Sequence, residues 1–149
     1  MIGLLQRVTE ASVTVDGQVI GQIGPGLLVL LGVQRGDTTV QAERLAERLL
    51  AYRVFDDEAG KMNLSLTQTG GELLLVPQFT LAAQTRTGTR PGFSHAANPE
   101  LGQALCDACV AAARAQWDKV ATGRFGARMD VRLLNQGPVT FWLEVPPPA

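Results

Sequence analysis

The sequence predicts an α+β fold in a single domain, with layered, mostly antiparallel β-sheets and two main helices on one side. Extended segments recur along the chain, several of them are joined by hairpin-like turns, and only two segments have amphipathic helical spacing. The 149 residues suffice for one ordinary hydrophobic core, but not for two. We expect the domain to span residues 1–145, followed by a Pro-rich tail at 146–149 that cannot continue a strand ladder.

The first part of the chain predicts a β-hairpin and then a buried strand. Apolar and polar residues alternate over 11–15, Asp16-Gly17 favours a type I′ turn, and an extended pattern resumes over 19–23. After the break at Gly24-Pro25-Gly26, residues 27–33 form a continuous apolar run. Such a run is typical of a strand covered on both faces.

Two segments predict helices. Thr38 and Gln41 have the spacing of a capping box, and apolar residues then follow on one helical face. Asn98-Pro99 places a capping residue before a proline in the first helical position, and an apolar stripe follows. We expect this second helix to end before Gly123.

Three further segments are predicted to be extended: Glu72 to Leu81, Met129 to Leu134 and Val139 to Val145. An extended chain would place Gln78 and Thr80 on one face and Phe79 on the other, so the first segment could line a pocket or be an ordinary half-exposed strand. Asn135 to Thr140 predicts a tight turn between the last two strands. It contains Gly137-Pro138, a kind of bond in which a cis peptide costs little.

Composition and charge narrow the class of protein. No stretch approaches the roughly 20 apolar residues of a membrane span, so we expect a cytoplasmic protein without membrane contact. The net charge of −1 does not indicate extensive nucleic-acid binding. However, residues 73–99 contain no acid but include Arg86 and Arg90, and Arg124 follows later. Either a local basic face or ordinary solvated charges would fit this distribution.

The familiar catalytic and metal-binding patterns are missing. Residues 56–60 lack the alternating ligand spacing of a calcium loop and predict a hairpin turn. His95 follows Ser94, but adjacency in sequence does not assemble a catalytic triad. Cys106 and Cys109 fall inside the second predicted helix, where we interpret them as packing residues. We therefore expect no metal and no cofactor.

Several segments, taken in order, resemble the D-aminoacyl-tRNA deacylase family. They are Gln6-Arg7-Val8, Ala11 to Val15, Gly60 to Ser65, Thr85-Arg86, Arg90-Pro91 and Thr122 to Gly126. Gln78-Phe79-Thr80-Leu81 is similar to the active-site strand motif of that family, and Asn135-x-Gly137-Pro138-Val139-Thr140 is similar to its Gly-cis-Pro motif. One position departs from the pattern. Pro77 stands where the family usually has serine, which removes one N–H and one hydroxyl from the pocket wall.

The resemblance implies a hydrolase that cleaves the ester between a D-amino acid and the 3′ end of tRNA. The backbone around Phe79 and Thr80 would stabilise the oxyanion, and Gln78 would shape the pocket. Arg7 would brace the Gly137-Pro138 loop, and Met129 would line the site. Water assisted by the ribose hydroxyl is favoured as the nucleophile over Thr80, because nothing resembles a base that could activate that threonine.

The resemblance also implies a homodimer in which Gly137-Pro138 of one subunit enters the pocket of the other. There it would exclude L side chains, while glycine, which has none, would be accepted. Two alternatives remain open. Pro77 motivates a related editing hydrolase with a shifted amino-acid preference, and the arginines motivate a non-catalytic RNA-binding module.

Overall fold

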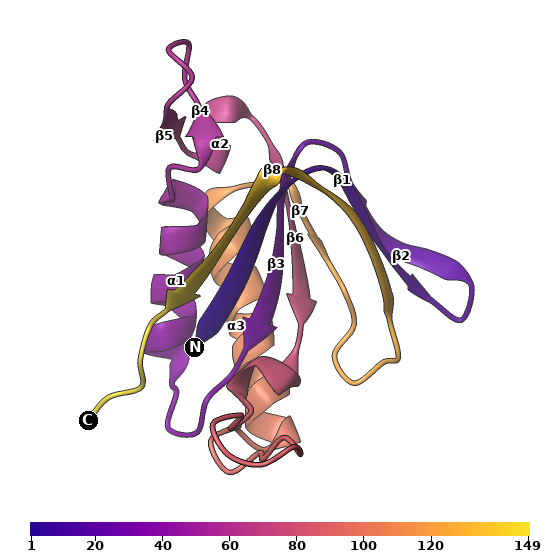
Figure 1. Cartoon of the computed structure of the whole chain (residues 1–149), viewed down its shortest axis with the longest axis vertical. Helices are drawn as coiled ribbons and strands as arrows, with labels where there is room; N and C mark the ends of the chain where they lie inside the picture. Colours follow the sequence, from indigo (N-terminus) through magenta and orange to yellow (C-terminus); the bar gives the residue numbers. More distant parts are fainter.

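The computed structural model describes residues 1–149. Its strands are β1 (Ile2–Val15), β2 (Gln18–Ile23), β3 (Gly26–Gly32), β4 (Phe55–Asp56), β5 (Met62–Leu64), β6 (Glu72–Pro77), β7 (Val120–Thr122) and β8 (Asp130–Glu144). Its helices are α1 (Thr39–Ala51), α2 (Leu66–Thr69) and α3 (Pro99–Gln116), with a short 3₁₀ helix, η1 (Phe79–Ala82) (Figure 1). None of the helices is both long and apolar enough to span a membrane.

Strand β1 organises the sheet because it changes partners along its length. Residues 2–8 pair antiparallel with β3 and residues 11–15 pair antiparallel with β2, while β8 follows the opposite side of β1 over nearly its whole length. Beyond β3, β6 and β7 continue the sheet in parallel. The outer half of β1 turns away with β2 and β8, which gives the sheet two layers (Figure 1). The α+β fold with mostly antiparallel pairing is thus confirmed.

The two layers approach each other closely at Gly21 in β2. A Cβ on this residue would lie 2.5 Å from the carbonyl oxygen of Thr122 in β7, so only glycine fits there without a shift of the backbone. A small core fills the space between the layers, consisting of Val8, Ala11, Val13, Ile23, Leu28, Leu74 and Val76.

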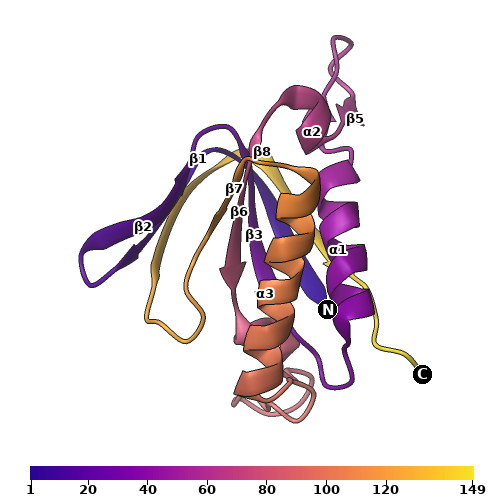
Figure 2. The ribbon, with the colours of Figure 1, turned by 180° about the vertical axis from the view of Figure 1, so that it is seen from behind.

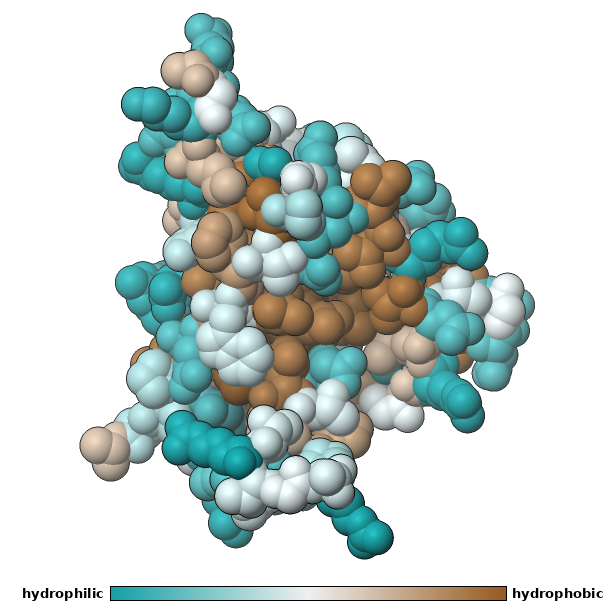
Figure 3. Space-filling model, in the orientation of Figure 1, coloured by the Kyte–Doolittle hydropathy of each residue, from teal (hydrophilic) through white to brown (hydrophobic).

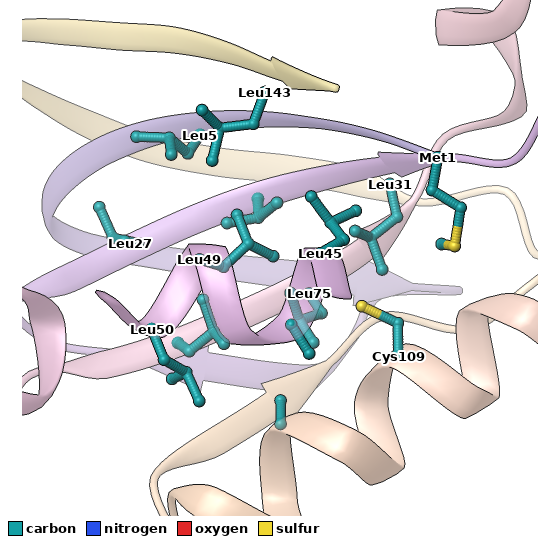
Figure 4. Close-up of a cluster of buried hydrophobic side chains, with 14 of the residues drawn as sticks. Met1, Leu5, Leu27, Leu31, Leu45, Leu49, Leu50, Leu75, Cys109 and Leu143 are labelled. Atoms are coloured by element: carbon teal, nitrogen blue, oxygen red, sulfur yellow. The ribbon is translucent and has the colours of Figure 1, made fainter. Parts of the chain in front are cut away.

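The larger core lies between the sheet and the helices. Successive side chains of a strand point to opposite faces, so the continuous apolar runs of β3 and β6 serve both cores. Leu27, Leu31 and Leu75 face the helices and pack with Leu45 and Leu49 of α1 (Figure 4). Helices α1 and α3 lie side by side on this face (Figure 2). The strand predicted for residues 27–33 is therefore covered on both faces, as expected.

The predicted caps and hairpin are present. The Thr38 hydroxyl caps α1 and Gln41 completes the capping box, while the Asn98 side chain accepts from the amide N–H of Leu101 at 2.9 Å in the first turn of α3. Asp16 and Gly17 adopt φ angles of 49° and 78° between β1 and β2, as a type I′ turn requires.

The prediction of one strand from Glu72 to Leu81 was wrong at its end. Strand β6 stops at Pro77, and the chain winds into η1. The parallel partner β3 ends at Gly32, so the residues after Gln78 have no neighbouring strand. The turn packs closely on Gly32, where an added Cβ would lie 2.9 Å from Cβ of Leu81.

The prediction of a tight turn between two C-terminal strands was also wrong. Strand β8 runs without reversal from Asp130 to Glu144, and residues 136–139 bulge out opposite Arg7. The Asn135 side chain holds the bulge, because its Oδ1 accepts from Val139 N–H at 3.1 Å and its Nδ2 donates to Thr140 Oγ1 at 2.8 Å. Residues that mark turns also mark bulges, which accounts for the error.

Candidate functional site

A mostly apolar cleft of about 980 Å³ lies at the carboxyl end of β6. One wall is formed by residues 77–79, where β6 passes into η1. A second comes from the segment that leads into α3 and from the first turns of that helix, and a third from residues 125–131. Its volume lies near the upper end of the range usual for ligand sites.

Pro77, Gln78 and Phe79 line this cleft, whereas Thr80 does not. Gln78 Nε2 donates a hydrogen bond to Thr80 Oγ1. The two side chains therefore meet, although through a helical turn and not along an extended strand. Because an amide N–H is a donor, Gln78 cannot act as a base toward the Thr80 hydroxyl.

The first amides of η1 are free to bind a ligand. Gln78 N–H donates to the carbonyl of Leu31 at 2.7 Å and completes the edge of the sheet. The N–H groups of Phe79 and Thr80 follow, and neither makes a hydrogen bond within the chain, because a helix provides no carbonyl for its first amides. Two adjacent unpaired donors thus lie where η1 borders the cleft.

Two aromatic rings stand at the cleft. Phe79 and Phe93 have ring centroids 5.3 Å apart at an interplanar angle of 45° and are 59% and 43% exposed. Phenylalanine side chains that are this exposed leave an aromatic surface available to a planar ligand.

The opposite wall is built by Met129 and Phe125. Met129 Sδ accepts from the Arg124 N–H at 3.4 Å, and Phe125 packs against Gly102 of α3, where an added Cβ would lie 3.3 Å from the ring. Cys106 of α3 also lines the cleft. Burial, with a smaller contribution from Asp107, raises the pKa of the Cys106 thiol to about 12, so it is not a thiolate near neutral pH.

Arg7, Gly137 and Pro138 form a separate group that does not line the cleft of the same chain. Arg7 is 8% exposed, and its guanidinium donates to the carbonyl of Gln136 at 3.2 Å and to that of Val54 at 2.8 Å. Gly137 and Pro138 are exposed, the peptide bond between them is cis, and Gly137 has a φ of +126°. Arg7 thus fastens the bulge of β8 to the body of the domain.

Sequence reasoning missed several residues of the cleft. Nothing in the sequence pointed to Phe93 or Arg35, because each reaches the cleft through a loop whose path depends on long-range packing. Phe125 lies within a segment that carried the family resemblance and could have been found there. Ser94 lines the cleft, but His95 lines a separate hollow of about 330 Å³. No group of three His, Cys, Asp or Glu side chains is placed to hold a metal ion.

Comparison with known proteins identifies the class to which this fold and cleft belong. A family model described as D-Tyr-tRNA(Tyr) deacylase matches residues 4–144. A D-aminoacyl-tRNA deacylase from Thioalkalivibrio sulfidiphilus is 66% identical, with 99% of each chain covered. Another from Nitrosococcus oceani is 60% identical over 99% of this chain and 95% of that protein. The chain belongs to the D-aminoacyl-tRNA deacylase family.

Solved structures share the same architecture. One described as a c-Myc DNA unwinding element binding protein is 39% identical with a TM-score of 0.93, over 98% of this chain and 99% of that one. A probable eukaryotic D-amino acid tRNA deacylase has a TM-score of 0.85 at 18% identity, over 97% and 98% of the two chains, which is a likeness of fold.

Proposed function

We propose that the protein hydrolyses the ester bond between a D-amino acid and the 3′ end of tRNA in the cytoplasm. The observation that carries the proposal is the pair of free amides at Phe79 and Thr80 beside the cleft, in a chain of this family. In the reaction, water attacks the ester carbonyl, and the electron pair of the C=O bond moves onto oxygen. The two N–H groups hold this oxyanion. When it collapses, the bond to the ribose oxygen breaks and that oxygen takes a proton.

The residues of the cleft favour water over a side chain as the nucleophile. Arg35 and Cys106 are the only ionisable side chains in its lining. Arginine stays protonated, and the raised pKa of the Cys106 thiol keeps it protonated as well. Without a base, neither Thr80 nor Ser94 can be activated. The neighbouring ribose hydroxyl of the substrate can assist the water, and the protein contributes position and amide dipoles.

Chiral selection would come from Gly137 and Pro138 of a partner subunit. Within one chain they lie outside the cleft, yet they are exposed and anchored by the buried Arg7. Their carbonyls would engage the α-amino group of the substrate and leave no space for an L side chain. Glycine has no side chain to exclude, so glycyl-tRNA would also be cleaved.

The surface of β8 supports such a homodimer. This strand pairs only with β1, so its other edge is open. Four large apolar residues of β8 are at least 37% exposed: Val131, Leu134, Phe141 and Trp142. Apolar side chains also gather over the middle of the sheet on the face drawn in Figure 3. A two-fold contact through β8 would bury such surface and bring the bulge of each subunit to its partner.

The decisive experiment is deacylation of matched D-tyrosyl-tRNA and L-tyrosyl-tRNA by the purified protein, with glycyl-tRNA as a third substrate. We expect rapid loss of the D ester, slower loss of the glycyl ester and no acceleration for the L ester over buffer. Equal rates for the D and L esters would contradict the proposed selection. Binding of tRNA without turnover of any ester would favour a non-catalytic RNA-binding module.

A further inference from the structure

Arginines lie on the segments that line the cleft or adjoin them. Arg35 is the only charged residue in the cleft lining. Arg124 and Arg128 bracket the lining residues 125–127. Arg86 and Arg90 belong to the loop that joins Phe79 to Phe93, and Arg86 lines the separate hollow of about 330 Å³. All five side chains are exposed. The loops that carry them lie at the lower end of the sheet in Figure 1.

These charges are not neutralised within the chain. The three ion pairs of the structure use the Met1 ammonium, Arg7 and Arg44, and none of the arginines at the cleft. Arg35 donates one long hydrogen bond of 3.5 Å to the carbonyl of Ser94. The carboxylates directly next to lining residues in the sequence are Glu100, Asp107 and Asp130, against five arginines. The mouth is therefore positive, although the whole chain has a net charge of −1.

We propose that Arg35, Arg86, Arg90, Arg124 and Arg128 form a phosphate clamp that holds the single-stranded 3′ end of tRNA while the ester lies at η1. This inference rests on the proposed function and adds the residues that would bind the acceptor end. A guanidinium presents paired donors that match phosphate oxygens. The five arginines come from three different loops, each of which contributes residues to the cleft lining or continues from them, so a strand whose terminal nucleotide occupies the cleft would pass close to them.

The exposed aromatic pair makes single-stranded RNA a better fit than another anion. Single-stranded nucleic acids are bound by grooves that combine basic side chains for the backbone with aromatic faces for the bases. Phe79 and Phe93 provide such faces at the same cleft as Arg35. A clamp at one site also explains how a slightly acidic protein binds a polyanion, because the local charge decides the contact.

The test compares D-tyrosyl-tRNA with 3′-O-D-tyrosyl adenosine, which carries the same ester but no phosphate. The variants are Arg35→Gln, the pair Arg86→Gln with Arg90→Gln, and the pair Arg124→Gln with Arg128→Gln. Arg44→Gln is the matched control, because Arg44 is an exposed arginine on α1. Melting curves establish that each variant folds.

For the tRNA ester we expect KM to rise roughly three- to tenfold for each pair, as for two exposed ion pairs. The slope of log KM against log salt should fall by about 0.7 for each phosphate that a variant no longer neutralises. Hydrolysis of the adenosine ester should stay unchanged in the two paired variants, and Arg44→Gln should behave as the wild type does with both substrates. Because Arg35 lines the cleft itself, the Arg35→Gln variant is judged only by the change in its salt slope.

Equal losses with both esters in the paired variants would overturn the clamp, since those arginines would then act on the pocket itself. An equally large rise in KM for Arg44→Gln would also overturn the clamp, because it would show that any lost positive charge weakens tRNA binding. If the wild type cleaves neither ester, the proposed function fails, but the affinity of the protein for uncharged tRNA still tests the clamp. In that case the arginine variants must lower the slope of log Kd against log salt, and Arg44→Gln must leave that slope unchanged.

Discussion

At the scale of a residue, the surroundings of Thr80 bear on the proposed mechanism. Its hydroxyl oxygen accepts a hydrogen bond from Gln78, and the cleft lining contains no base. Thr80 is therefore poorly placed to be a nucleophile, while its backbone N–H remains free. In the proposed mechanism the peptide backbone would contribute the chemistry, and the side chains would contribute the shape of the site.

This view predicts that Thr80→Val retains activity within about tenfold of the wild type, because the substitution keeps the backbone amide. Gly137→Val should instead abolish activity. An added Cβ at Gly137 would lie 2.8 Å from Val139 Cγ2 and 3.1 Å from Arg7, and the φ of +126° disfavours side chains. Single-turnover deacylation of D-tyrosyl-tRNA measures both effects. A Thr80→Val enzyme that binds substrate but never turns it over would restore the threonine nucleophile.

The two buried cysteines predict a loss of stability at alkaline pH. Burial raises the pKa of the Cys106 and Cys109 thiols from the usual 9.0 to about 12, with a smaller contribution from Asp107 for the first and from Cys106 for the second. Above pH 9 the unfolded chain releases these protons and the folded chain keeps them. Ionisation therefore favours unfolding as pH rises from 9 toward 12.

We expect the urea midpoint to fall from pH 9 upward, and to fall less steeply in the Cys106→Ala, Cys109→Ala double variant. The variant should also be less stable than the wild type at pH 7, because it loses buried sulfur atoms. Urea titrations of both proteins at several pH values check this. If the urea midpoint falls equally steeply with pH in both proteins, other titrating groups dominate the loss of stability at alkaline pH.

At the scale of elements, local signals predicted most of the fold. The capping residues of α1 and α3 and the Asp16-Gly17 turn act within a few residues, so the sequence alone reveals them. The end of β6 depends on where β3 stops, and the bulge of β8 depends on its register with β1. Neither can be seen in the local pattern.

The candidate site likewise contains residues that the sequence revealed and residues that it did not. Gln78, Phe79 and Thr80 were found through the family resemblance, because periodicity alone equally favoured an ordinary strand. Phe93 and Arg35 were not found, since their loops are brought to the cleft by contacts far along the chain.

The contact between η1 and β3 yields a prediction about the position of this helix. Gly32→Ala should push η1 outward, because the new Cβ would lie 2.9 Å from Cβ of Leu81. We expect a loss of about 1–3 kcal/mol in unfolding free energy and a larger fractional loss of kcat. Gly24→Ala is the control, since its Cβ would meet only Glu72 Oε1 at 3.5 Å. Urea unfolding and deacylation rates check both variants, and equal behaviour of the two would refute a steric role for Gly32.

At the scale of the whole molecule, the proposed trans arrangement can be tested with mixed dimers. One chain carries disabling substitutions at 78–80 and the other carries them at 137–138, after each homodimer has been shown to fold and to be inactive. If the bulge inserts into the partner, one of the two sites collects both defects and the other collects neither, so deacylation returns in the mixed dimer. A mixed dimer that stays inactive would show that each chain completes its own pocket.

The pairing of β1 with β8 has a consequence for how the protein folds. Ile2 lies opposite Glu144, so the pair formed by the two longest strands joins segments that are almost a whole chain apart. Contacts of such long sequence separation are formed against the largest loop-closure entropy and slow the folding of a domain. During synthesis, β1 leaves the ribosome long before the strand that completes its other edge. Until β8 arrives, the nascent chain exposes an unpaired apolar strand, the kind of edge that chaperones protect from aggregation.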